Sequence, residues 1–155
     1  MINVLKDLWQ ARKAPKIFLE AAVDHVEVGE DYLMLGLDLA WHSTMPEPLQ
    51  IEEIQVTLYP NGRRKDGIRF YAQGHFARLP HQKVIKKMPG ARQFELPSNI
   101  AHIEHIRFMT RAILDLAPGT YEAEFQSTVL EGSFVHSANL AFTAKNRYRT
   151  SEAWA

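Results

Sequence analysis

Apolar and polar residues alternate with a period of two in several segments of this 155-residue chain. The segment YLMLGLDLAW is the clearest example, because Leu33, Leu35, Leu37, Leu39 and Trp41 share one parity. Successive side chains of a β-strand point to opposite faces of a sheet, so this parity predicts one face buried in a core. Further alternating runs cover residues 17–23, 54–58, 68–76, 106–108, 121–129 and 134–142. About seven to eight short strands separated by turn signals predict an all-β sandwich.

Local signals refine this prediction. The parity changes near His25, which predicts a β-bulge. The stretch 81–93 is the least periodic and is interpreted as a loop with at most a short edge strand. Residues 98–105, SNIAHIEH, are compatible with a short helical turn capped by Ser98 or Asn99.

The two ends of the chain differ from the alternating part. Residues 2–12 place Ile2, Leu5, Leu8 and Trp9 on one helical face, which predicts an amphipathic helix that ends before Pro15. Packing against its own domain or a second subunit is favoured over lying on a membrane surface. We therefore expect three parts: a helix over 1–14, one β-sandwich domain over 15–146 and a tail over 147–155.

Composition excludes several classes of protein. The chain has no cysteine, so disulfides, thiolate chemistry and cysteine-ligated zinc are impossible. No stretch approaches the roughly 18–20 uninterrupted apolar residues of a membrane span, and the start lacks an apolar core of signal-peptide length. We expect a soluble, cytoplasmic protein.

The stretch LAPGTYEAEF carries a resemblance to a known architecture. A predicted alternating strand opens with Tyr121, and just before it stand Leu116, Pro118 and Gly119. They resemble the tyrosine corner of immunoglobulin-like and fibronectin type III-like sandwiches. The resemblance covers residues 106 to 144. The resemblance implies an antiparallel immunoglobulin-like sandwich in which the tyrosine hydroxyl bonds to backbone upstream. It transfers no functional residue, and the missing cysteine pair excludes an antibody-type domain.

Charge is strongly segregated along the chain although the net charge is zero. Residues 17–62 hold nine acids and no Lys or Arg, whereas residues 63–92 hold nine bases and one acid, Asp66. This pattern indicates either a binding surface or strands that neutralise one another when folded. The residues predicted to bind a partner are Arg63, Arg64, Lys65, Arg69, Lys83, Lys86, Lys87 and Arg92.

The favoured hypothesis is a non-enzymatic binding or assembly module that recognises a protein partner or its own copy through these charged faces. A nucleic-acid-binding domain is the first alternative, because aromatic residues are interleaved with the cations of residues 63–92. Phe70 and Phe76 share the inward parity of their strand, however, so only Tyr71 is available for stacking.

A small metal-dependent enzyme is the second alternative. His102 and His105 would share a face on a helical turn, with Glu104 beside them, but would point to opposite faces of a strand. Glu122 and Glu124 lie on the outward parity of their strand, which favours a solvated pair over acid–base catalysis. We predict no catalytic residues, no metal site and no cofactor.

Overall fold

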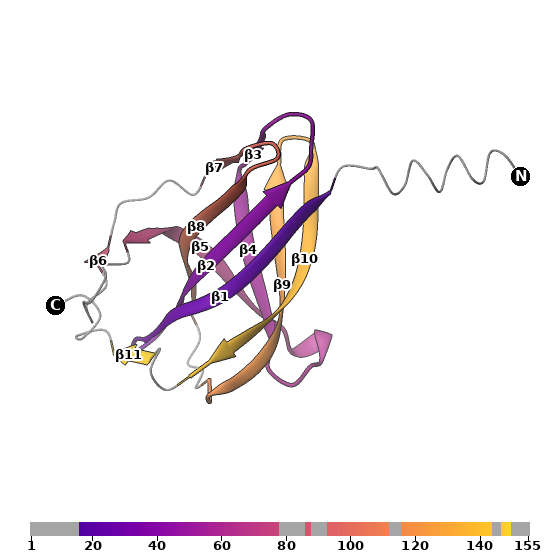
Figure 1. Ribbon diagram of the computed structural model, residues 1–155. Helices are drawn as coiled ribbons and strands as arrows, with labels where there is room; N and C mark the ends of the chain where they lie inside the picture. Colours follow the sequence, from indigo (N-terminus) through magenta and orange to yellow (C-terminus); the bar gives the residue numbers. More distant parts are fainter. Residues whose placement is uncertain (1–15, 78–85, 88–92, 112–115, 144–146, 150–155) are drawn as a thin grey trace, which may run out of the picture.

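The computed structural model describes residues 16–77, 86–87, 93–111, 116–143 and 147–149 (Figure 1). The helix predicted over residues 1–14 lies outside these ranges. The described residues form β-strands and one short 3-10 helix, η1 (Arg64–Asp66). Among them, no helix has the length and apolar character needed to cross a bilayer.

The main sheet has the strand order β10-β9-β4-β5-β8-β2-β1-β11, and β6 pairs with β5. β3 and β7 form a separate two-stranded sheet. The strand pairs are antiparallel except for β1 with β11, which is parallel. The strands are β1 (Ile17–Val28), β2 (Leu33–Ser43), β3 (Leu49–Ile51), β4 (Glu53–Tyr59), β5 (Ile68–Ala77), β6 (Lys86–Lys87), β7 (Phe94–Leu96), β8 (Ala101–Thr110), β9 (Gly119–Val129), β10 (Gly132–Phe142) and β11 (Arg147–Arg149). The prediction of an all-β fold is confirmed, and residues 147–149 of the predicted tail extend the sheet.

The main sheet is strongly curled, so that β1, β2 and β8 lie in front of β4 and β9 (Figure 1). The rings of Phe108 on β8 and Phe125 on β9 are 6.4 Å apart, although β4 and β5 separate these strands within the sheet. The two rings therefore meet across the interior. At the other side β1 lies next to β10, where His136 Nε2 donates a hydrogen bond to the carbonyl oxygen of Ile17 at 2.7 Å. The sheet thus nearly closes on itself around one core.

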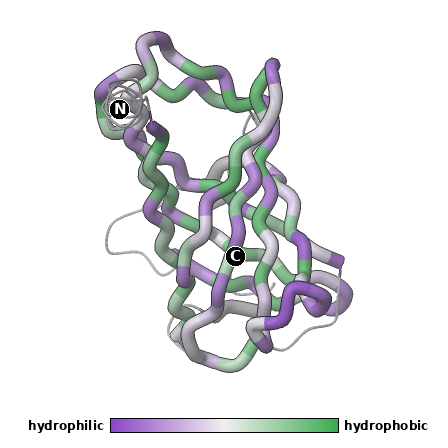
Figure 2. Tube along the Cα trace, turned by 90° about the vertical axis from the view of Figure 1, so that its right-hand side faces the viewer, coloured by the Kyte–Doolittle hydropathy of each residue, from purple (hydrophilic) through white to green (hydrophobic). Residues whose placement is uncertain are grey.

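The core follows the predicted parity. The five residues Leu33, Leu35, Leu37, Leu39 and Trp41 are at most 1% exposed. Figure 2 shows hydrophobic and hydrophilic residues alternating along the strands. The predicted bulge is also confirmed, because the pairing of β1 with β2 shifts register between Val23 and His25. Other buried residues with the predicted parity are Ile54, Val56, Leu58, Phe70, Ile106, Phe108, Ala123, Phe125, Leu140 and Phe142.

The start of β9 contains the predicted tyrosine hydrogen bond. The hydroxyl of Tyr121 donates to the carbonyl oxygen of Ala117 at 2.6 Å. The Tyr121 ring meets Phe142 edge-on at 5.3 Å, and Leu116 is buried. These contacts fix the entry of the chain into β9 and the parity of the β9–β10 hairpin.

The helical turn over residues 98–105 was wrongly predicted. Asn99 has a left-handed φ of 60°, and β8 begins at Ala101 and continues to Thr110. β8 pairs with β2 from Ala101 to Thr110, and Ile106 and Phe108 enter the core. Burial and backbone pairing with a neighbouring strand override the local spacing of the histidines.

The tyrosine hydrogen bond yields a first prediction. We expect Tyr121→Phe to lower the free energy of unfolding by about 1 kcal/mol, because it removes one hydrogen bond and little apolar surface. Tyr71→Phe is the matched control, since the exposed Tyr71 side chain lies on the outer face of β5. Urea unfolding monitored by circular dichroism measures both values. Equal stability of the Tyr121→Phe variant and the wild type would contradict a stabilising role for this bond.

Candidate functional site

The described basic residues do not form one continuous patch. Arg63, Arg64 and Lys65 lie in the connection between β4 and β5, and Arg69 follows near the start of β5; all four are exposed. Lys86 and Lys87 form β6, which pairs with the other end of β5. The ten residues of β5 span about 30 Å, so the two basic groups are far apart. They lie on opposite sides of the molecule in Figure 1.

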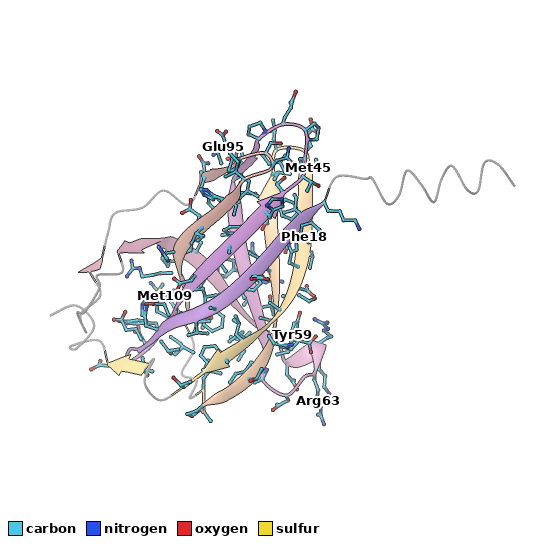
Figure 3. The ribbon with its side chains drawn as sticks, viewed as in Figure 1. Phe18, Met45, Tyr59, Arg63, Glu95 and Met109 are labelled. Carbon is cyan, nitrogen blue, oxygen red and sulfur yellow. The ribbon has the colours of Figure 1, made fainter. Side chains whose placement is uncertain are left out.

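Lys83 and Arg92, which are also predicted to bind a partner, lie outside the described residues. Figure 3 shows Arg63 at the end of the molecule that holds the β4–β5 connection.

Arg64 is held by neighbouring side chains. Its guanidinium donates to carboxylate oxygens of Glu122 and Glu124, each at 3.0 Å, and its Cζ lies 4.4 Å from the centre of the Tyr59 ring. Glu122 and Glu124 are therefore on the outer face of β9 as predicted, but half-buried and ion-paired. The charge of Arg64 is thus neutralised by Glu122 and Glu124 of the β9–β10 hairpin, and not by the acidic segment 17–62.

His102 and His105 do not converge on a metal site. On β8 they fall on opposite faces; His102 Nε2 lies 2.7 Å from Glu104 Oε1, and His105 Nδ1 lies 2.5 Å from Asp38 Oδ1. Across the described ranges, no group of three or more histidines and carboxylates has a geometry that could hold a metal ion. Each histidine instead has a carboxylate neighbour of its own.

A buried polar cluster lies on the outer face of β1, β2 and β8, where the sequence pattern alone predicts solvent. We define it as Asp24, His25, Glu27, Tyr32 and Arg107. His25 and Glu27 are fully buried and Arg107 is 3% exposed. His25 Nδ1 is 3.0 Å from Asp24 Oδ2, and the Tyr32 hydroxyl donates to Glu27 Oε1 at 2.9 Å. Burial lowers the pKa of Arg107, and the negative charge of Glu27 opposes this shift.

Gly36 makes room for this cluster. It pairs with His25 on one side and with Arg107 on the other, so all three share the outer face. A Cβ atom at Gly36 would lie 1.9 Å from Cε1 of the His25 ring. The isolated glycine within the apolar run of β2 therefore indicated, in the sequence itself, a position where a neighbouring side chain lies close to the backbone.

Next to the cluster lies a shallow groove of about 360 Å³, the outer-face groove, across β1, β2 and β8. Cross-strand pairing brings Glu20, Ala40 and Ile103 into one row and Ala22, Asp38 and His105 into the next. Because the side chains of Ala22 and Ala40 are small, the sheet face is hollowed at their positions. Ile103 beside them is 61% exposed. Its lining residues are Glu20, Ala21, Ala22, Asp38, Leu39, Ala40, Ile103 and His105.

A second groove of about 340 Å³, the seam groove, lies where β1 meets β10. Phe18 and Val135 contribute to it from the two strands, and each is 53% exposed. Figure 3 shows Phe18 and Met45 at the same end of the molecule. The seam groove is lined by Lys16, Ile17, Phe18, Met45, Phe134, Val135 and His136.

The grooves combine exposed apolar side chains with charged ones, an arrangement that suits binding of another chain. Sequence reasoning missed both. The available signal was a large apolar residue at a strand position that the alternation assigns to the solvent-facing side, as at Phe18 and Ile103.

Comparisons with known proteins assign no family. No family model matches the chain, and no curated protein matches it. Similar solved structures include an engineered protein (11% identity, TM-score 0.33, 83% of this chain and 20% of that one). They also include an alkylpurine DNA glycosylase from Pseudomonas fluorescens bound to DNA with an abasic-site analogue (14%, 0.33, 83% and 30%). A third is a family 123 glycoside hydrolase from Clostridium perfringens (11%, 0.34, 81% and 27%). The chain thus spans less than a third of each of these structures, and the likeness carries no functional argument.

The contact of Gly36 with His25 gives a second prediction. We expect Gly36→Ala to lower the free energy of unfolding by about 1–3 kcal/mol, because the added methyl group overpacks the His25 ring. In a His25→Ala background the same substitution should cost much less. Urea unfolding of the two single variants and the double variant measures this coupling. Equal costs of Gly36→Ala in both backgrounds would show that the ring does not limit the space.

Proposed function

We propose that this chain is a non-enzymatic binding or assembly module with an immunoglobulin-like arrangement of strands, which recognises a protein partner or its own copy. The outer-face groove is the observation that carries this proposal. It joins the exposed Ile103 to the carboxylates of Glu20 and Asp38 on a regular sheet face.

Two features support the immunoglobulin-like arrangement. The Tyr121 hydroxyl makes the upstream backbone hydrogen bond that defines a tyrosine corner. The contact of Phe108 with Phe125 joins two groups of strands across a common core. Such domains serve many functions, so the proposed function depends on the surface and not on the fold.

The chemistry of the outer-face groove indicates the kind of partner. Its apolar centre, Ala22, Ala40 and Ile103, suits aliphatic or aromatic side chains. Glu20 is exposed at the edge, and Asp38 is half-buried beside His105. A partner segment with apolar residues and a neighbouring Lys or Arg fits this combination, and the charges would fix its orientation.

The exposed residues Arg63, Lys65 and Arg69 offer a second charged surface for the same role. A nucleic-acid-binding function has less support, because Arg64 is ion-paired and β6 lies at the opposite end of β5. The two functions differ in salt dependence. Retention of oligonucleotides at low salt that falls steeply with added salt would favour nucleic acid over a protein partner.

The groove yields a third prediction. We expect Ile103→Glu to weaken binding of a partner at least tenfold, because a buried carboxylate replaces an apolar contact at the centre of the interface. Leu130→Glu is the matched control; Leu130 is 88% exposed but lies in the turn between β9 and β10, outside the groove. The wild-type chain is immobilised, captured proteins are identified by mass spectrometry, and affinities are then measured with the purified partner.

The control should bind like the wild type. If Ile103→Glu also binds like the wild type, the outer-face groove is not the recognition surface. In that case charge reversal of Arg63, Lys65 and Arg69 tests the basic surface separately.

A further inference from the structure

The chain itself carries a segment of the kind proposed for the outer-face groove, an apolar side chain with a neighbouring cation. Tyr71 and Arg69 lie two residues apart on β5, so their side chains share the outer face of that strand. Tyr71 is 44% exposed, and Arg69 is also exposed. Within the described part of the chain, Arg69 has no carboxylate partner, whereas Arg64 is ion-paired. The Tyr71–Arg69 pair therefore presents an aromatic ring and a positive charge to solvent.

A second exposed segment has the same combination but a less suitable charge. Among the exposed large apolar residues of the described ranges, Phe18 is the other one with a cation two positions away, at Lys16. Glu20 lies two positions after Phe18 on the same face, so this segment would bring a carboxylate to the carboxylates of the groove. The residue two positions after Tyr71 is the uncharged Gln73. Electrostatic complementarity therefore favours the Tyr71–Arg69 pair.

The spacing of the Tyr71–Arg69 pair matches that of the groove. Ala40 and Asp38 also lie two residues apart, on β2, and both line the groove. Residues two apart on a strand are separated by about 7 Å. A ring over Ala40 would contact Ile103 in the same row, and a guanidinium would then reach Asp38. An ionised carboxylate has several acceptor positions, so Asp38 can accept from a guanidinium while it keeps its contact with His105.

We propose that the Tyr71–Arg69 pair of one copy binds in the outer-face groove of a second copy. The Tyr71 ring lies over Ala40 beside Ile103, and the Arg69 guanidinium donates hydrogen bonds to Asp38. The inference rests on the proposed function of this groove, and it names the partner as a second copy of the chain.

The two surfaces cannot meet within one copy. The groove lies on β1, β2 and β8, whereas Arg69 lies on the part of β5 that pairs with β4, and all of these strands belong to one continuous sheet. Their contact therefore joins different surfaces of two copies, and each added copy brings a further groove and a further pair. Such a head-to-tail contact gives an open assembly or a closed ring.

Sedimentation velocity of the chain over a wide range of concentration tests this inference. We expect the wild type to form dimers and larger species as the concentration rises. Arg69→Glu should weaken the association at least tenfold, because it places a carboxylate against Asp38 of the second copy. Lys65→Glu is the matched control and should associate like the wild type. It makes the same change of charge in the exposed β4–β5 connection, outside the face of β5.

Mixing two variants separates a head-to-tail contact from a symmetric one. Ile103→Glu damages the groove and leaves the Tyr71–Arg69 pair intact, whereas Arg69→Glu does the reverse. Alone, each variant should stay monomeric at concentrations where the wild type associates. An equimolar mixture should form dimers and no larger species, because one intact groove and one intact pair remain to meet. The absence of dimers in the mixture would overturn the inference.

Two further results would also overturn it. One is a wild type that stays monomeric at every concentration, and the other is equal weakening of the association by Arg69→Glu and Lys65→Glu. Neither result decides the proposed function of the groove, which has its own test. The loss of affinity of Ile103→Glu for a purified captured partner is measured without self-association of the chain.

Discussion

β5 pairs with two different strands and thereby connects the two sides of the curled sheet. Residues 68–71 of β5 pair with β4, and residues 71–75 pair with β8, with a register shift in the pairing to β8 between Ala72 and Gly74. Gly74 has a φ of 142°, a conformation that L-residues with a side chain rarely adopt. This irregularity lets one sheet turn over a single core, so that Phe108 and Phe125 meet in the interior.

The course of β5 through this curled sheet also explains where the charged residues lie. Because β5 runs from one end of the molecule to the other, the basic segment around it is divided between the β4–β5 connection and β6. Arg64 is drawn to Glu122 and Glu124 on β9. The acidic residues Glu20 and Asp38 remain at the outer-face groove, where apolar surface is also exposed. The surface that we propose for recognition therefore combines apolar and acidic residues.

Much of the fold could be predicted from the sequence, because the parity of β2 and of the β9–β10 hairpin directly reflects burial on one face. The conformation of residues 98–105 could not be predicted from the local sequence, because it depends on the pairing of β8 with β2. The buried cluster of His25, Glu27 and Arg107 was missed for a related reason. Parity assigns polar residues to solvent, whereas Gly36 creates space that only the paired strands reveal.

We propose above that the outer-face groove recognises a partner. Nuclear magnetic resonance of the isotope-labelled chain, titrated with the captured partner, can locate the binding surface residue by residue. We expect the largest amide shift changes to fall on the groove, at Glu20, Ala40, Ile103 and His105. Changes confined to residues 63–69, with the groove signals unmoved, would contradict it.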